Sequence, residues 1–332
     1  MNIDLQAKEI TPVRHTFDRV IAYTGDKPAS RYLESMLSTQ STENFHYRPT
    51  WEPEFELHDI KRTAIQLRDW NALRDPRQFY YAAWTMTRAR QQESIEANHQ
   101  FVESRNLLEA MPAALHAQIS QVLIPLRHVS WGGNMNNCNI CSRGYGTALT
   151  APALMHAMDH LGAAQYITRL GLAAGEGTDL LDHGKQVWLE HEAWQPLRKA
   201  LEDSFVIQDP IQLFVWQNLA LEGLLFPLIY DEYIDNHVML QGGSAIAMLM
   251  AFMPEWHRES ARWVDAVIKV IAAESDDNKR LVQSWVDQAV STVQAALLPI
   301  ARLALQQAGD DAMQNARTAL CARLTKIGLQ TA

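Results

Sequence analysis

The sequence predicts an all-α protein built as a bundle of long helices. The stretch that follows Pro76, up to residue 108, contains no internal Gly or Pro, the residues that most readily interrupt a helix. Residues spaced three to five apart mark one face of 277–307, while the alternating pattern of strands is nearly absent from the chain. The residues of that face are Leu281, Trp285, Gln288, Val293, Leu297 and Ile300. Long helices with short connections are typical of a helical bundle.

The first 50 residues differ from the rest, because they show little periodicity. They mix Thr, Ser, Pro and Gly with spaced aromatic residues, whereas disordered tails are poor in aromatic residues. The aromatic residues are Phe17, Tyr23, Tyr32, Phe45 and Tyr47, followed by Trp51. We therefore expect residues 1–50 to form an extended arm on the surface of this chain or of a partner. A partly ordered N-terminus is the alternative.

Helical signals begin directly after this arm. Leu57, Ile60, Ala64, Leu67 and Asn71 recur at helical spacing. An Asp-Pro pair at 75–76 fits an N-cap followed by the first residue of a helix that could extend to about residue 108. Pro112 fits the start of another helix, which the Gly-Gly pair at 132–133 is expected to end.

The second half of the chain continues the helical pattern. A helix is expected from about residue 147 to 174, ending at Gly175, and the Asp-Pro pair at 209–210 starts one that runs towards His237. After a break at the Gly-Gly pair at 242–243, further helices are expected from Pro254, over 277–307 and over 310–327. Because no Pro/Gly/Ser-rich linker separates them, residues 51–332 are expected to form a single helical domain.

The composition indicates a globular protein and argues against nucleic acid as a partner. Hydrophobic residues make up 47% of the 332 residues, and 38 Asp+Glu against 29 Lys+Arg give a formal charge of −9. Binding to phosphate backbones needs clustered Lys and Arg, which are lacking here. The 10 Trp and 12 Met residues indicate large packed surfaces, including interfaces.

A reducing cytoplasm is the expected location. The N-terminus has no apolar segment of the kind found in secretory signals. The most apolar stretch, 213–230, carries Gln217, Asn218 and Glu222, which indicates a buried helix rather than a membrane span. Only three cysteines occur, too few for a disulfide scaffold.

Helical bundles often hold a carboxylate-bridged di-iron centre, so its ligand pattern was sought. The centre needs a Glu from each of two helices and a Glu-x-x-His from each of two others. One Glu-x-x-His occurs, Glu96 to His99, in a highly polar stretch that fits an exposed or interface helix face. Between Glu109 and Asp159 there is no Asp or Glu at all. A complete di-iron site is therefore not expected.

No other motif indicates a catalytic site. Cys138 and Cys141 form a Cys-x-x-Cys pair without the further ligands of a zinc site or the strand–helix setting of a thioredoxin-like motif. They fit two small packed thiols, and a redox role stays open. Gly-x-Ser-x-Gly, a P-loop and a Gly-x-Gly-x-x-Gly after a strand are absent.

Two segments resemble a known family. The run RHVSWGGNMNNCNICSRGYGTALTAPALMHAMDHLGAAQYITRLGLA (127–173) and the run DPIQLFVWQNLALEGLLFPLIYDEYI (209–234) resemble the β subunit of bacterial multicomponent phenol hydroxylases, in the soluble di-iron monooxygenase family. The stretch RDPRQFYYAAW (74–84) fits the resemblance as well. The resemblance implies a ferritin-like helical bundle with additional peripheral helices.

The resemblance also implies that this chain has lost the iron ligands. The family's active subunit has a Met-Asp-Glu-Leu-Arg-His-x-Gln pattern, which here keeps its frame but has His160 for the Glu ligand and Ala163 for the His ligand. Glu222 matches the third Glu ligand, and Trp256 and Glu259 stand in place of the second Glu-x-x-His. The isolated first Glu would fall near 128–131, where no carboxylate occurs. No catalytic, metal or cofactor site is therefore expected in this chain.

The implied function is that of a structural subunit within an enzyme. The resemblance implies an (αβγ)₂ hydroxylase whose α subunit holds the di-iron centre and inserts one oxygen atom of O₂ into an aromatic ring. A separate reductase with NADH, FAD and a 2Fe-2S cluster would supply electrons, and a small effector protein would regulate turnover. Substrate choice among phenol, cresol and toluene would belong to the α subunit.

Two alternatives stay open at this point. One is a stand-alone di-metal oxidase that draws unusual ligands from Glu96, His99, Glu222 and His257. The other is a helical scaffold protein unrelated to oxidation.

Overall fold

The computed structural model describes residues 18–25, 27–37, 48–175 and 177–330, and within these ranges it contains helices and no strand. The all-α prediction is confirmed. The α-helices are α1 (Asp18–Thr24), α2 (Arg31–Leu37), α3 (Tyr81–Ser104), α4 (Ala113–Gln118), α5 (Leu126–Arg143), α6 (Thr147–Ala174), α7 (Asp179–Glu190), α8 (Gln195–Ser204), α9 (Pro210–Phe214), α10 (Glu222–Phe226), α11 (Ser244–Met250), α12 (Phe252–Glu274), α13 (Asp276–Leu305) and α14 (Gly309–Lys326).

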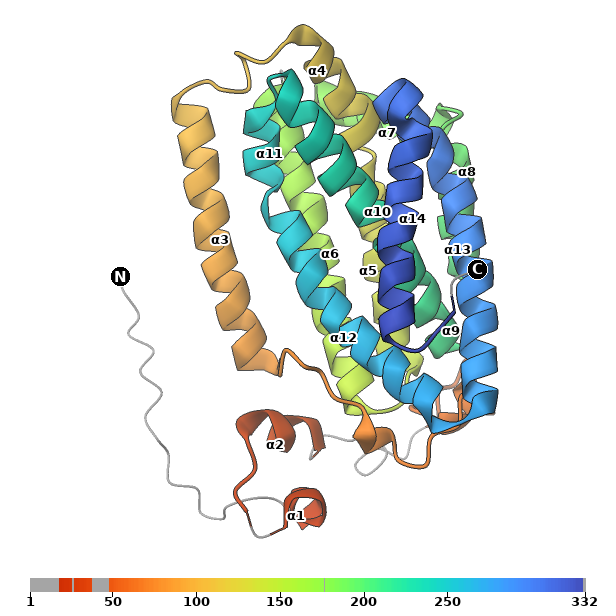
Figure 1. Cartoon of the computed structure of the whole chain (residues 1–332). Coiled ribbons are helices and arrows are strands. Elements are labelled where there is room, and N and C mark those ends of the chain that lie inside the picture. The colour runs from red at the N-terminus through yellow and green to blue at the C-terminus, as the bar shows by residue number, and fades with distance from the viewer. Residues whose placement is uncertain (1–17, 26, 38–47, 176, 331–332) are drawn as a thin grey trace.

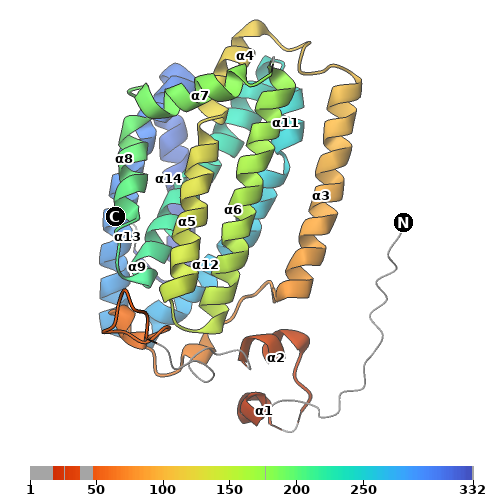
Figure 2. The ribbon, with the colours of Figure 1, turned by 180° about the vertical axis from the view of Figure 1, so that it is seen from behind.

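Long, roughly aligned helices form the body of the molecule (Figure 1). α5 and α6 lie side by side on one face, and α13 and α14 pack together on the other side (Figures 1 and 2). Between them lies a continuous helical rod over residues 210–241, in which α9 and α10 alternate with the π-helical segments Val215–Leu221 and Pro227–Val238. Most of the rod's side chains are buried, so it forms the centre of the bundle.

Helix α3 stands apart from this body (Figure 2). It approaches the bundle mainly at α11. Between α3, α6 and α12 lies a groove of about 380 Å³, with Trp84, Tyr166, Phe252 and Trp256 in its walls. Tyr81 and Met86 of α3 are exposed.

The predicted helix over 147–174 is confirmed, as are the helix that starts after Asp209 and the helices over 277–307 and 310–327 to within a few residues. Asp209 caps its helix because its carboxylate accepts hydrogen bonds from the backbone N–H groups of Ile211 and Gln212. The break at 242–243 is confirmed, since Gly242 takes a φ of 94° in the left-handed region that favours glycine.

The prediction that the Gly-Gly pair at 132–133 ends a helix is wrong. Both residues lie inside α5 and are buried. A Cβ atom on Gly132 would lie 2.5 Å from Leu201, and one on Gly133 would lie 2.6 Å from the His160 ring. The two glycines therefore serve close helix packing rather than helix termination.

Three other boundaries differ from the prediction. Asp75 does not start a helix: its side chain is buried and hydrogen-bonded to Arg77, and Gln78 turns the chain with a φ of 54°, so α3 begins only at Tyr81. The helical spacing over 57–71 yields only the 3₁₀ turns Ile60–Arg62 and Trp70–Ala72. Pro254 lies in the first turn of α12, which begins at Phe252. Helices α7, α8 and α11 were not predicted.

The expected extended arm over 1–50 is only partly described. Its described part contains the short helices α1 and α2, so this part is helical rather than extended. Residues 1–17 and 38–47 lie outside the described residues. The division into 1–50 and 51–332 stays a prediction.

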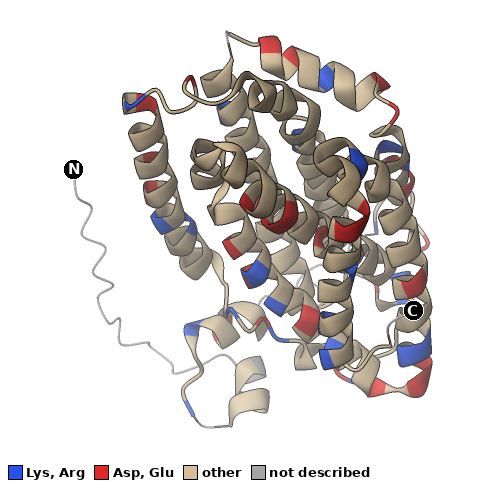
Figure 3. Ribbon diagram, turned by 45° about the horizontal axis from the view of Figure 1, so that its top comes forward, with Lys and Arg blue, Asp and Glu red and all other residues tan. Residues whose placement is uncertain are grey.

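Two helical stretches are long and apolar enough to cross a membrane by length and composition, namely 210–241 and 276–326. In the first, 94% of the apolar window is buried inside the protein. The second comprises α13 and α14, which turn back on each other and pack side by side. Both are typical of bundle helices. In the view of Figure 3, acidic and basic residues are interspersed along the helices.

Candidate functional site

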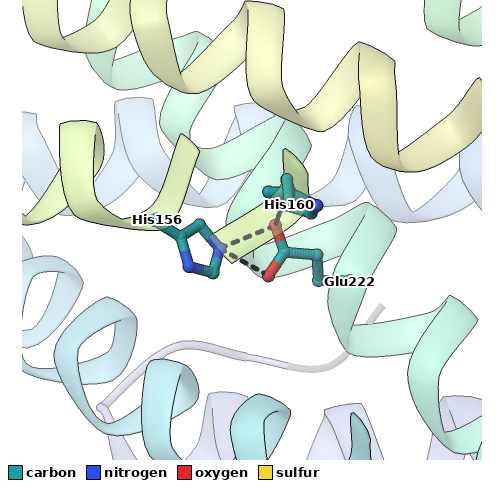
Figure 4. Close-up of side chains that lie close together, drawn as sticks. All are labelled: His156, His160 and Glu222. Atoms are coloured by element: carbon teal, nitrogen blue, oxygen red, sulfur yellow. Dashed lines mark hydrogen bonds and ion pairs between the residues drawn. The ribbon is translucent and has the colours of Figure 1, made fainter. Parts of the chain in front are cut away.

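A single carboxylate lies between two imidazole rings in the centre of the bundle (Figure 4). The Nε2 atom of His156 lies 2.9 Å from Oε2 and 3.1 Å from Oε1 of Glu222, and Nε2 of His160 lies 3.0 Å from Oε1. All three side chains are buried. Within the described ranges, they form the one group of three or more His, Cys, Asp or Glu whose ligand atoms lie within 4.8 Å of one another.

Helix geometry brings the two imidazoles and the carboxylate together. His156 and His160 are four residues apart on α6, so both rings project from the same helix face towards the central rod. Glu222 begins α10 directly after a π-helical segment, and Gln217 lies five residues before it. Residues five apart share a face in a π-helix, and Nε2 of Gln217 lies 3.2 Å from Oε1 of Glu222.

Further buried amides extend this hydrogen-bonded cluster towards α5 and α8. The Gln217 side-chain oxygen accepts from Nδ2 of Asn136 at 2.9 Å, and Nδ2 of Asn136 also lies 2.9 Å from Oγ of Ser204. Next to them, Asn137 and Asn218 exchange a reciprocal pair of hydrogen bonds. The polar groups in the centre of the bundle are thus bonded to one another, as buried polar groups require.

The environment fixes the charge of the cluster. Burial raises the pKa of the Glu222 carboxyl, but the nearby imidazoles of His156 and His160 outweigh burial and hold this pKa well below its usual range. Burial lowers the pKa of His160 despite the neighbouring carboxylate. Glu222 is therefore an anion at neutral pH, and His160 is a neutral imidazole.

Aromatic rings enclose the cluster. Trp256 stacks on His156, with ring centroids 5.0 Å apart, and meets the edge of His160 at 5.1 Å. Trp263 contacts His156 from another side. The cavity beside Glu222 and His160 measures only about 10 Å³, which is about the room that one water needs.

Only some of the ligand positions predicted from the sequence lie in the cluster. His160 and Glu222 meet in the cluster, whereas Ala163 offers no donor atom and lines the groove next to α3. The Trp256 indole donates a hydrogen bond to Asp159 at 3.1 Å. Glu259 pairs with Arg88 at 2.7 Å.

Arg88 joins two carboxylates beside the cluster. Its guanidinium lies 2.6 Å from Asp159 and 2.7 Å from Glu259, and all three side chains are largely buried. Trp84 donates a further hydrogen bond to Asp159 at 3.1 Å. The carboxylate of Glu259 is thereby neutralised by Arg88 instead of contributing to the central cluster.

The remaining candidate residues do not assemble into a site. Glu96 is exposed on α3 and pairs with Arg169 at 2.6 Å, while His99 is buried. His257 is stacked on Phe226, and burial lowers its pKa to about 3. Cys138 and Cys141 are free thiols on α5.

Sequence reasoning missed His156. Its spacing of four residues from His160, on a helix that was correctly predicted, is the signal that could have identified it.

The comparisons with known proteins assign the family. A family model described as methane/phenol/alkene hydroxylase matches residues 51–275. The chain belongs to the methane/phenol/alkene hydroxylase family. This hydroxylase-family chain is 44% identical to the phenol 2-monooxygenase oxygenase component DmpL of Pseudomonas sp. strain CF600, with 100% of this chain and 99% of that protein covered.

Structural and more distant similarities agree with this assignment. The hydroxylase-family fold superimposes on xenon-pressurized phenol hydroxylase from Pseudomonas sp. OX1 with a TM-score of 0.91 and 40% identity, covering 98% of this chain and 99% of that one. The hydroxylase component subunit beta of the toluene-4-monooxygenase system of Ectopseudomonas mendocina is 18% identical over 81% of this chain and 79% of that protein.

The donor groups of this hydroxylase-family chain do not fit a di-iron centre. Such a centre takes four carboxylates and two imidazoles from four helices. The cluster supplies one carboxylate, Glu222, and two imidazoles from a single helix. The Trp256 indole is bonded to Asp159 and Glu259 is bound to Arg88, so within the described part of the chain no second carboxylate joins Glu222 in the cluster.

Proposed function

We propose that this chain is a non-catalytic β subunit of the hydroxylase component of a phenol- or toluene-type multicomponent monooxygenase. The proposal rests on which residues occupy the expected iron-ligand positions. Among these positions Glu222 alone keeps the expected ligand type, and it is bound by His156, His160 and Gln217. Glu259 carries a carboxylate where a His is expected, and it pairs with Arg88. A relative named as a beta subunit and relatives named as oxygenase components support the same role.

The proposed partners follow from this role. An α subunit would carry the di-iron centre, a γ subunit would complete an (αβγ)₂ assembly, and a reductase with NADH, FAD and 2Fe-2S and a small effector would act on it. The complex would work in the cytoplasm without binding nucleic acid or membrane, and the free state of all three cysteines fits that compartment.

An exposed apolar surface supports a subunit role. Trp131 and Met135 on α5 and Leu154 and Met158 on α6 are each more than 40% exposed, and the two helices lie side by side (Figure 2). Large exposed apolar patches are typical of protein–protein interfaces. These four residues are the α5/α6 patch.

A pull-down tests the role. The full-length tagged chain is expressed in its native host, and the bound proteins are identified and quantified by mass spectrometry. We expect a larger partner with two intact Glu-x-x-His motifs in equal amount.

Trp131→Glu in the α5/α6 patch should reduce the recovery of this partner. Leu240→Glu serves as the matched control, because Leu240 is an exposed apolar residue in the turn Met239–Gln241, outside the patch. Recovery of the chain alone would contradict the proposal.

The non-catalytic part of the role needs its own measurement. When complexes with wild-type chain and with Glu222→Gln chain are compared at equal concentration of assembled complex, aromatic hydroxylation should be equal. A loss of hydroxylation from an intact complex would contradict the proposal.

The stand-alone oxidase has less support. Its ligands would be Glu96, His99, Glu222 and His257, but Glu96 is exposed and bound to Arg169. In the described residues, none of Glu96, His99 and His257 belongs to a group of three clustered ligand atoms.

A further inference from the structure

The central cluster has no task in the proposed function, yet its three side chains are almost completely buried. We propose that His156, His160 and Gln217 form a metal-free anion lock, in which their N–H groups hold the Glu222 carboxylate and join α6 to the central rod. The lock takes the place of a metal centre and excludes one. This inference concerns the chain's own residues and does not depend on the subunit role.

The first argument for the lock is the position of the protons on the two imidazole rings. Glu222 can only accept hydrogen bonds as an anion, so the Nε2 atoms of His156 and His160, at 2.9 and 3.0 Å, both carry a proton. With Nε2 as the donor, Nδ1 of each ring can remain a bare lone-pair nitrogen. Both Nδ1 atoms are buried, and neither has a hydrogen-bond partner among the residues that the structure describes.

The same Nδ1 atoms argue against a metal ion. A histidine that ligates a metal through Nε2 carries its proton on Nδ1 and donates it to a carboxylate, a carbonyl or water. Metal binding at this cluster would bury two N–H donors without acceptors, one on His156 and one on His160. Metal binding would also remove both N–H groups from the carboxylate. A lone-pair nitrogen without a partner is a smaller defect than an orphaned buried N–H group.

Space gives an independent argument. The His160 ring rests on α5 so closely that a Cβ on Gly133 would lie 2.6 Å from it. Trp256 stacks on His156 and makes an edge contact with His160. The adjoining cavity of about 10 Å³ holds at most about one water. The three protein donors and that water make four ligands, fewer than the six of the octahedral coordination that iron prefers with two imidazoles and a carboxylate. Zinc needs only four ligands, so the argument against zinc rests on the Nδ1 atoms and on charge.

The net charge of the site is a further argument against a metal ion. A divalent cation with one carboxylate would leave a net positive charge in a site walled by Trp256 and Trp263, with no polar group of the described residues left to solvate it, whereas the negative charge of the lock meets three N–H donors. The nearby carboxylates of Asp159 and Glu259 are bound to Arg88 and do not compensate. As a lock, the cluster carries one negative charge that three side chains solvate.

Metal analysis is the primary test. Full-length wild-type and Glu222→Gln chains, each alone and in complex with co-purified partners, are loaded with Fe²⁺, Zn²⁺ or Co²⁺, dialysed and measured by mass spectrometry of the metals. We expect equal metal content in both chains, so that any ion on surface residues cancels in the comparison. One additional equivalent in the wild-type chain, with Co²⁺ ligand-field absorption that Glu222→Gln abolishes, would overturn the lock.

A second measurement needs no variant that must fold. Nitrogen-15 NMR of histidine-labelled wild-type chain reports the protonated ring nitrogen of each imidazole. We expect Nε2–H and a bare Nδ1 for His156 and His160 at neutral pH, unchanged by chelator. A proton on Nδ1 that disappears or moves with chelator would overturn the inference. If no partner is recovered, the proposed subunit role fails, while both measurements on the chain alone still decide the lock.

Discussion

Gly133→Ala tests whether α5 and His160 are in the close contact that the lock requires. The new Cβ would lie 2.6–2.8 Å from three atoms of the His160 ring, closer than real Cβ contacts occur. The ring cannot swing away freely, because His160 is 3% exposed and lies against Trp256. The expected result is a loss of unfolding free energy.

The size of the loss follows from three effects. Alanine gains about 1 kcal/mol over glycine in a helix interior, whereas an extra carbon in a packed core costs about 1–3 kcal/mol. Moving His160 away from the Glu222 anion loses a charged hydrogen bond of about 1.5–3 kcal/mol. The net destabilisation is therefore about 1.5–5 kcal/mol.

Gly162→Ala is the matched control. Gly162 lies in the interior of α6, and a Cβ atom there would meet nothing within 4 Å. This variant should gain up to about 1 kcal/mol from helix propensity alone. Urea unfolding of both full-length variants, followed by circular dichroism, gives the comparison. If Gly133→Ala were as stable as Gly162→Ala, the close contact between α5 and His160, and the reasoning built on it, would be refuted.

Three further predictions concern the surroundings of the cluster. Arg88→Met should cost about 3 kcal/mol, because it removes the guanidinium that pairs with both Asp159 and Glu259. Trp84 and Trp256 still donate to Asp159, and Arg77 still lies 3.9 Å from Glu259, which keeps the loss at this level. Arg169→Met, which breaks exposed pairs, should cost at most about 1 kcal/mol, and urea unfolding measures both. Folding lowers the pKa of His257 to about 3, so below pH ~6.5 the unfolded chain binds one more proton than the folded chain. The free energy of unfolding therefore falls as pH falls, by up to about 1.4 kcal/mol per pH unit. His257→Gln should flatten this slope between pH 6 and 4, and an unchanged slope would contradict the prediction. Burial raises the pKa of the half-buried Cys141 thiol, so its alkylation at neutral pH should be slower than that of a free cysteine peptide. Alkylation of Cys141 as fast as that of the peptide would contradict this.

Locally encoded features of the fold could be predicted from the sequence. Asp209 caps its helix with contacts to the next two or three residues, so the local sequence contains the whole signal. The break at Gly242 is similar, because a positive φ is a property of one residue. By contrast, Gly132 and Gly133 carry the same local signal as a helix end, and only their tertiary neighbours, Leu201 and His160, show that they serve packing.

The candidate site was half predictable for a similar reason. The motif frame of the resembling family predicted His160 and Glu222 as ligand positions, and the structure brings these two side chains together. The contact of Gln217 with Glu222 was hidden, because a spacing of five residues brings side chains together only in a π-helix. The α-helical period that guided the sequence analysis places such a pair on different faces.

The hydrogen bonds of Glu222 explain why this carboxylate persists while the neighbouring ligand positions carry other residues. An apolar residue at 222 would leave the N–H groups of His156, His160 and Gln217 without an acceptor, and each unsatisfied buried donor costs about 1–3 kcal/mol. By contrast, the methyl side chain of Ala163 makes no hydrogen bond to a buried polar group, so replacing Ala163 by another residue carries no such penalty. Stability is therefore a sufficient physical reason for Glu222 in this cluster.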